Sequence, residues 1–149
     1  VLDYPTLEEE AEVLYRIDAG VFTSNQTAVI ELEDVRRLQQ LTRRVYVDPA
    51  IVRYAVGIVY VTRHAERYID PAVARFIEFG ASPRGSIAFT QAARARALLA
   101  GRDHVVPDDI KALAHRVLRH RVVLGFEAIA EDVQVESVVD ALVATVRTP

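Results

Sequence analysis

The chain has 149 residues, of which 51% are hydrophobic and 26% are charged, and its formal net charge is −3 at pH 7. This size and balance are typical of one soluble domain, and the acidic charge argues against a general nucleic-acid binder, which would usually be basic. The sequence has no cysteine, which excludes disulfides and thiol chemistry, and no methionine, from which we expect a domain cut from a larger protein. The lack of cysteine is typical of a cytoplasmic protein, which is the location we expect. No stretch approaches about 18 apolar residues without a charge, so we expect no membrane helix.

The first part of the chain predicts three helices. A capping box at Thr6 and Glu9 opens the first, and Asp48 with Pro49 opens the third. Leucine and valine at helical spacing indicate the second. In chain order we expect a helix over 6–18, a segment over 19–30 that matches no known pattern, a helix over 31–44, an extended piece over 45–47, and a helix over 49–63.

The second part predicts further helices and short extended pieces. Asp70 and Pro71 open a short helical segment that ends before Gly80, and Gly101 closes the long helix after it. In order we expect helices over 70–79, 83–100, 108–119 and 136–146, an extended piece over 121–126, and a pairing of 105–106 with 45–47. This pattern predicts an all-α helical bundle with a small two- or three-stranded β addition.

The run from Gly80 to Gly85 contains the most informative residue, Arg84. Ser82 is a predicted N-cap and Pro83 suits the first helical position, which places Arg84 in the first turn. At about 100° per residue, Arg84 is expected in the middle of an apolar arc. The arc consists of Ile87, Ala88, Ala92, Ala95, Leu98 and Leu99.

Two interpretations of Arg84 remain open from spacing alone. The first is an intramolecular salt bridge or a solvated helix end, which is how most surface arginines are found. The second is a phosphate-binding arginine, since a carboxylate or phosphate matches the planar guanidinium and a helix N-terminus favours anions. Other arginines cluster at 36–37, 43–44 and 116–121, and we interpret them as solvated helix faces.

The usual patterns of enzymes and metal sites are missing from the sequence. The histidines are not spaced at i, i+3 or i+4, so no helix face carries a pair of metal ligands and we expect no metal site. The sequence lacks a Gly-x-Ser-x-Gly nucleophile motif and a Gly-x-x-x-x-Gly-Lys-[Ser/Thr] phosphate-binding loop. It also lacks the paired acids that hold Mg²⁺, so we expect no catalytic residues and no phosphoryl transfer by this chain alone. The four histidines are His64, His104, His115 and His120.

The order of motifs resembles the C-terminal lid of MoxR-type AAA+ ATPases. Ala-Ser-Pro-Arg at 81–84 and Pro-Asp-Asp at 107–109 form the most specific pair. Two positions depart from the family pattern: Gly85, where alanine is common, is expected to loosen the first turn, and Val106, where threonine or serine is common, cannot cap the next helix through its side chain. Further matching segments, which extend the resemblance over nearly the whole chain, lie at 4–10, 45–48, 62–63, 92–95, 98–99, 101–103, 110–113, 117–121 and 126–128.

The resemblance implies a domain organisation and a set of partners. Residues 1–5 would be the end of a nucleotide-binding core, with Tyr4 and Pro5 at the hinge, and residues 6–149 would be the helical lid. The implied partners are the AAA+ core of the same parent chain, neighbouring subunits of a ring oligomer, and a protein with a von Willebrand factor A domain. No membrane or nucleic-acid partner is expected.

The resemblance also implies a role for Arg84. It would be the sensor-2 arginine, supported by Ser82, Pro83 and Gly85, and would sense ATP that the core binds together with Mg²⁺. The parent would then be an ATP hydrolase that remodels protein partners as a chaperone does, while the isolated lid would have no enzymatic activity and no bound cofactor. The alternative is a free-standing helical adaptor that binds protein or DNA without nucleotide.

Overall fold

The structure is a computed structural model that describes residues 4–21 and 28–149. The chain divides into two compact units, residues 1–35 and 36–149, and each is described by itself. Residues 1–3 of the segment 1–5, predicted as the end of the core, and residues 22–27 of the segment 19–30 lie outside the described residues. Within the described part, no helix is both long and apolar enough to cross a membrane.

The first unit contains helix α1 (Leu7–Asp18), which begins and ends as predicted. The hydroxyl of Thr6 accepts a hydrogen bond from the Glu9 amide at 3.3 Å, and the Glu9 carboxylate accepts one from the Thr6 amide at 2.8 Å. The bond from the Thr6 amide, together with one that the Thr6 hydroxyl donates to the same carboxylate at 3.0 Å, holds the pKa of Glu9 below its usual range. Gly20 follows the helix in the left-handed region, with φ of 69°. The predicted capping box is therefore confirmed.

Helix α2 (Leu32–Arg44) runs across the boundary between the units, and the remaining elements belong to the second unit. The predicted all-α fold class with a small β addition is confirmed. The other elements are α3 (Pro49–Thr62), η2 (Ala65–Arg67), α4 (Pro71–Ala74), β1 (Ile77–Phe79), α5 (Arg84–Leu99), α6 (Pro107–Leu118), β2 (Val123–Leu124), α7 (Phe126–Ala130) and α8 (Val135–Thr145).

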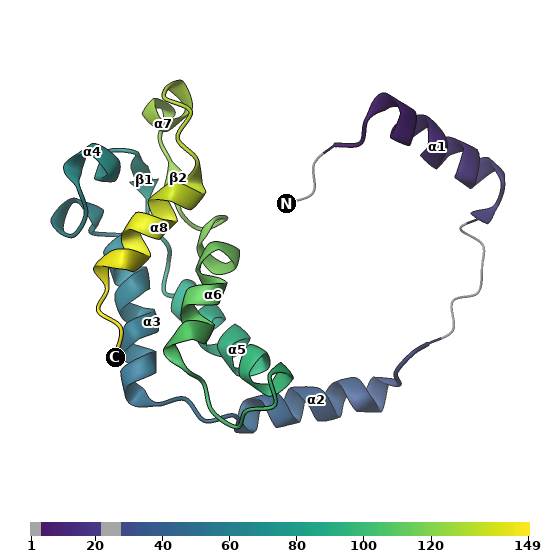
Figure 1. The fold of residues 1–149 in the computed structure, drawn as a ribbon, viewed down its shortest axis with the longest axis horizontal. Helices are drawn as coiled ribbons and strands as arrows, with labels where there is room; N and C mark the ends of the chain where they lie inside the picture. Colours follow the sequence, from purple (N-terminus) through teal and green to yellow (C-terminus); the bar gives the residue numbers. More distant parts are fainter. Residues whose placement is uncertain (1–3, 22–27) are drawn as a thin grey trace. The chain divides into compact units, whose positions relative to one another are not determined.

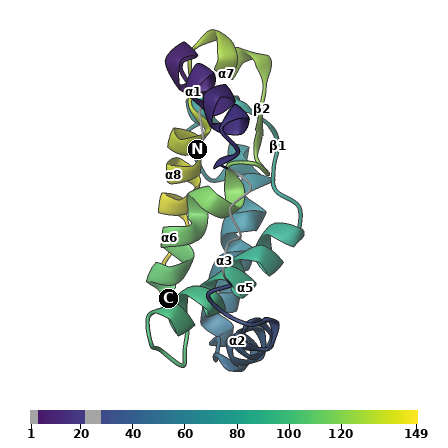
Figure 2. The same ribbon diagram turned by 90° about the vertical axis from the view of Figure 1, so that its right-hand side faces the viewer.

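Helices α3, α5, α6 and α8 form the bundle of the second unit (Figures 1 and 2). Helix α5 packs against α3 and α6, and α8 packs against the same two helices from another side. Strands β1 and β2 lie together with α7 at one end of this bundle (Figure 1). The largest side chains that the bundle buries are Phe89, Ile58, Ile110, Leu118 and Leu142. Because these residues come from all four helices, the core depends on the whole second unit.

The β addition differs in part from the prediction. Only α4 of the segment 70–79 is helical, and β1 follows it and pairs antiparallel with β2. The prediction of a helix up to Gly80 was wrong because the aromatic and β-branched residues of β1 favour a strand and find a partner in β2. The predicted pairing of 45–47 with 105–106 is displaced, since Tyr46 forms one parallel bridge with His104 and its carbonyl accepts from the Val105 amide at 2.9 Å.

A glycine turn ends α5 and places Arg102 for its contacts with α6. Gly101 adopts a positive φ of 72°, where a side chain would be strained. The amide of Arg102 bonds to the Ala97 carbonyl and the amide of Gly101 to the Leu98 carbonyl, both at 2.9 Å. This pair of bonds is a Schellman motif, which satisfies two carbonyls at the end of the helix.

Asp109 lies in the first turn of α6 and is the charged residue through which α6 contacts the end of α5. Its side chain is almost fully buried and accepts two parallel hydrogen bonds from Arg102, at 2.7 and 2.8 Å. It also accepts a bond from the Val106 amide at 3.0 Å and contacts Arg96 at 3.2 Å. Asp109 thus supplies the half of a capping box in which the N3 side chain accepts from the N-cap amide, while the other half is missing because valine has no side-chain acceptor. Burial would raise the pKa of Asp109, but the hydrogen bonds from Arg102 and Val106 and the two arginine charges hold it below its ordinary value.

We predict that Asp109→Asn lowers the free energy of unfolding by about 3 kcal/mol, because it breaks a buried ion pair while keeping the side-chain shape. The matched control is Asp108→Asn, since that side chain is 87% exposed and lies 4.0 Å from Lys111. The control should change stability by less than about 0.5 kcal/mol. Urea denaturation of the wild-type chain and of the two variants measures both changes in the free energy of unfolding. Equal changes in the two variants would contradict the assignment of Asp109 to a buried ion pair.

The contribution of Asp109 should also depend on pH. Its pKa in the folded chain lies below the ordinary value of 3.8, so the unfolded chain takes up this proton first as the pH falls. The stabilisation is therefore complete above the unfolded pKa and is lost as the pH falls through the folded pKa. Denaturation at a series of pH values should show that the difference in the free energy of unfolding between the wild-type chain and Asp109→Asn decreases below about pH 4. A difference that stays constant as the pH falls further would disprove the prediction.

Candidate functional site

Arg84 is the first residue of α5, as the sequence predicted to within one position. Pro83 already has helical angles, with φ of −56° and ψ of −18°, and stands at the N-cap position. The Ser82 side chain makes no capping bond, so the prediction of a Ser82 cap was wrong. Pro83 holds the N-cap position in its place, and the Gly85 amide donates to the Ser82 carbonyl at 2.8 Å as the backbone enters the first turn.

The Arg84 side chain is exposed and lies beside the buried stripe of α5. Within the described residues, no hydrogen bond or ion pair involves its guanidinium. The intramolecular salt bridge that sequence reasoning left open is therefore absent from the described part of the chain.

The predicted apolar arc of α5 is correct only in part, since Ala88, Ala92 and Leu98 pack half-buried against the core. The buried residues of the helix are Gly85, Phe89, Ala93 and Ala97, at i, i+4 spacing. Two members of the predicted arc, Ile87 and Leu99, are 56% and 88% exposed. The prediction placed Ile87 and Leu99 on the core-facing side of the helix, whereas the stripe that α5 buries in the bundle consists of one large side chain, Phe89, among small residues.

Gly85 allows α5 to approach α3 closely. A Cβ at this position would lie 3.2 Å from a methyl carbon of Val59 and 3.6 Å from the Cβ of Ala81. The expectation that Gly85 only loosens the first turn is therefore incomplete, because its missing side chain also makes room for packing next to Arg84.

The segment before Arg84 is held by the end of α3. The Thr62 hydroxyl accepts a hydrogen bond from the Ala81 amide at 2.8 Å, and Arg63 donates to the Ala81 carbonyl at 3.1 Å. A Cβ on Gly80 would lie 2.3 Å from the Thr62 carbonyl oxygen, so only glycine fits this approach. Sequence analysis matched Thr62 and Arg63 to the family pattern but gave them no role, because residues 18 or 19 positions apart reveal their contact only in the fold.

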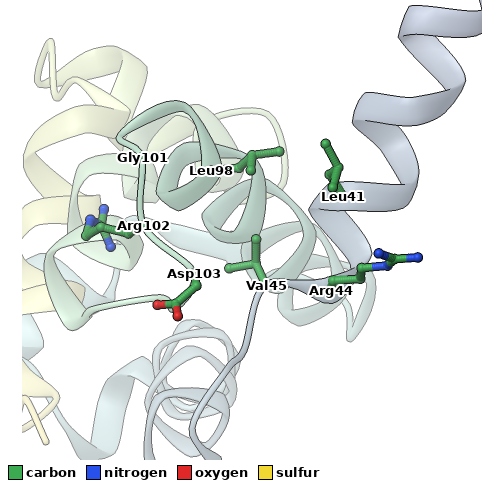
Figure 3. A pocket seen from close by; sticks show the side chains of 7 residues that line it. All are labelled: Leu41, Arg44, Val45, Leu98, Gly101, Arg102 and Asp103. Carbon is green, nitrogen blue, oxygen red and sulfur yellow. The ribbon is translucent and has the colours of Figure 1, made fainter.

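A separate cavity of about 340 Å³ opens near the other end of α5. Figure 3 shows the side chains of Leu41 and Leu98 turned toward each other across it, with Val45 between them. Arg102 contributes to the wall, but its guanidinium is committed to Asp109. Arg84 is not among the lining residues, so this apolar cavity is distinct from the candidate anion site.

Tyr4 and Pro5, the predicted hinge residues, are exposed, and Tyr4 is 95% exposed. Among the described residues, no group of three or more histidine, cysteine, aspartate or glutamate side chains is arranged to hold a metal ion. Two histidines instead contact single carboxylates, His104 with Asp103 and His115 with Asp140, each at 2.8 Å.

Comparisons with known proteins agree with this architecture. The family model of the AAA lid domain matches residues 69–142. Chaperone MoxR1 of Mycobacterium tuberculosis is 38% identical over 98% of this chain and 38% of its own length. Protein MoxR of Methylorubrum extorquens is 32% identical over 80% of this chain and 34% of its own length.

The fold also matches a solved structure. The crystal structure of a "putative ATPase" from Cytophaga hutchinsonii superposes with a TM-score of 0.80 and 30% sequence identity, covering 99% of this chain and 45% of that one. The chain thus spans about two-fifths of the length of the proteins it matches. Together, the family match, the MoxR relatives and the shared fold show that this chain belongs to the lid domains of MoxR-type AAA+ ATPases.

Proposed function

We propose that this lid serves an ATP-hydrolysing protein and that Arg84 is its sensor-2 arginine. The observation that supports this role most directly is the exposed guanidinium of Arg84, which has no partner within the described residues and stands at the start of α5. A guanidinium can donate two parallel hydrogen bonds to phosphate oxygens, and the N-terminus of a helix adds partial positive charge. Both features suit a terminal phosphate.

The residues of this chain fit one part of a nucleotide site. Arg84 and the start of α5 would contact the γ-phosphate, while the remaining phosphate contacts, the Mg²⁺ and the hydrolytic groups would come from an AAA+ core in the same protein. Bound ATP supplies the phosphoanhydride that is cleaved. The task of Arg84 is to bind the γ-phosphate and to stabilise the negative charge on it during transfer.

The same contact would couple hydrolysis to movement of the lid. A contact that exists with ATP and is lost after hydrolysis changes the relative stability of two lid positions. Tyr4 and Pro5 would lie at the hinge between core and lid, where proline restricts the backbone. In this proposal, ring-forming neighbours and a protein with a von Willebrand factor A domain are the partners, and chaperone-like remodelling in the cytoplasm is the outcome. The name of the relative MoxR1 supports the chaperone role.

Arg84→Ala in the longer ATPase should lower the turnover number by a factor between about ten and 10³, because a charge that stabilises the transferring group is lost. The melting temperature of the lid should hardly change, since an exposed substitution usually alters stability by less than about 0.5 kcal/mol. Arg84→Lys should restore only part of the activity, because lysine keeps the charge without the planar fork. Steady-state ATP hydrolysis and thermal unfolding are the measurements.

Arg53→Ala is the matched control, because Arg53 is also exposed and helical but lies near the start of α3. It should leave both hydrolysis and melting temperature near the wild-type values. A wild-type turnover number in Arg84→Ala, or a large loss of melting temperature of the lid in that variant, would show that Arg84 is not the sensor.

The chain by itself should bind ATP weakly and should not hydrolyse it, because one arginine and one helix end form only part of a phosphate site. Calorimetric titration with ATP and a phosphate-release assay on the purified chain test this expectation. Turnover that persists after removal of contaminating ATPases would contradict it, and tight binding of ATP would show that the phosphate site is complete within the lid.

A further inference from the structure

The last residue of α3, Thr62, has a buried side chain whose hydrogen bonds are all within the protein. Its exposed fraction is 1%. The hydroxyl donates to the Val59 carbonyl at 2.7 Å and accepts from the Ala81 amide at 2.8 Å. A hydroxyl has one hydrogen, so its donor is used inside the helix and its lone pair is free for Ala81. The buried amide of Ala81 therefore depends on this one side chain for its partner.

Arg63 binds the second polar backbone group of Ala81, its carbonyl. Its Nη1 donates to the Ala81 carbonyl at 3.1 Å. Consecutive side chains of the α3 C-terminus thus bind the amide and the carbonyl of Ala81, a residue that is itself fully buried. Such a pair of bonds fixes both the position and the orientation of the peptide chain at Ala81.

Steric contacts with α3 reinforce these bonds on both sides of Ala81. Gly80 lies so close to the α3 C-terminus that a Cβ there would overlap the Thr62 carbonyl oxygen. Gly85 packs against Val59, one turn earlier in α3. The chain before and after Arg84 therefore rests on the last turn of α3, while the Arg84 guanidinium remains exposed.

Only two residues separate this fixed point from Arg84. Pro83 has a restricted φ, and the Ser82 carbonyl is bonded to the Gly85 amide at 2.8 Å, so little backbone freedom remains between Ala81 and Arg84. A shift of the α3 C-terminus must consequently move the Cα of Arg84 with it.

We propose that Thr62 is a positioning residue for Arg84, and that the C-terminus of α3 determines where the arginine meets its phosphate. This inference rests on the proposed sensor role of Arg84. Thr62 does not touch the nucleotide in this scheme. It acts through the Ala81 amide, so its effect on hydrolysis must disappear when the guanidinium is absent.

A double-mutant cycle in the longer ATPase tests the inference. The variants are Thr62→Val, which replaces the hydroxyl by a methyl group, Arg84→Ala, and the two combined. Thr62→Val should lower the turnover number about tenfold, since a small displacement of a catalytic contact is costly. In the Arg84→Ala background the same change should have no further effect. Thr62→Ser, which keeps the hydroxyl, should stay within about twofold of the wild-type value.

The results separate this inference from the function on which it rests. Wild-type turnover in Arg84→Ala overturns the sensor role itself. If Arg84→Ala is impaired but Thr62→Val reduces turnover equally in both backgrounds, Thr62 supports the fold alone and only the positioning role is overturned. Unchanged turnover in Thr62→Val has the same consequence.

A second measurement does not depend on activity. Amide hydrogen exchange of the chain should show the Ala81 amide protected in the wild type and in Thr62→Ser, and faster in Thr62→Val, with the Leu118 amide in α6 unchanged. Unchanged exchange at Ala81 would overturn the proposed contact. If Thr62→Val does not fold, Arg63→Ala, which removes the bond to the Ala81 carbonyl, replaces it in the double-mutant cycle, with Arg53→Ala as its control. An effect on turnover that is additive with Arg84→Ala again overturns the inference.

Discussion

The close contact between the end of α3 and the segment 80–85 is the constraint on which the candidate site depends. Gly80 touches backbone atoms of α3, and the Thr62 hydroxyl and the Arg63 guanidinium bind the peptide groups of Ala81. None of these interactions involves Arg84, yet together they fix the place where α5 begins. The arginine thus has a firmly held backbone and a free side chain, which is the combination that a sensing contact requires.

The two motifs that carry the resemblance to the family have different physical roles. The Ala-Ser-Pro-Arg motif presents an exposed cation at the start of α5. The Pro-Asp-Asp motif is architectural in this fold, because Asp109 is buried and joins the end of α5 to the start of α6 through Arg102. A buried carboxylate with two arginines is costly to desolvate, and its value lies in fixing the geometry of one turn. Both ends of α5 are therefore anchored, one to α3 and the other to α6.

Local chemistry explains why much of this fold could be predicted from the sequence. The capping box at Thr6 and the Asp-Pro starts at 48–49 and 70–71 act through neighbouring atoms, so they indicate helix starts without knowledge of the fold. The start of the long helix with Arg84 in its first turn was also predicted locally, from Pro83, although the Ser82 cap is absent. Where the outcome depended on tertiary contacts, prediction failed. Strand β1 requires its partner β2, and the buried face of α5 is set by how closely α3 and α6 approach, which a count of large apolar residues does not reveal.

The same distinction between local features and tertiary contacts explains why only part of the site could be predicted from the sequence. Arg84 could be identified because its helix start and its resemblance to a family motif are local features. The contribution of Thr62 could not, because a threonine at the end of a helix usually bonds to its own preceding turn, as this one also does with Val59. Its second bond, to Ala81, exists only because Gly80 lets the chain pass against α3. An internal carboxylate partner would stabilise Arg84 but would compete with phosphate for the same donors, so the absence of a partner within the described residues is better suited to a reversible contact than to a structural one.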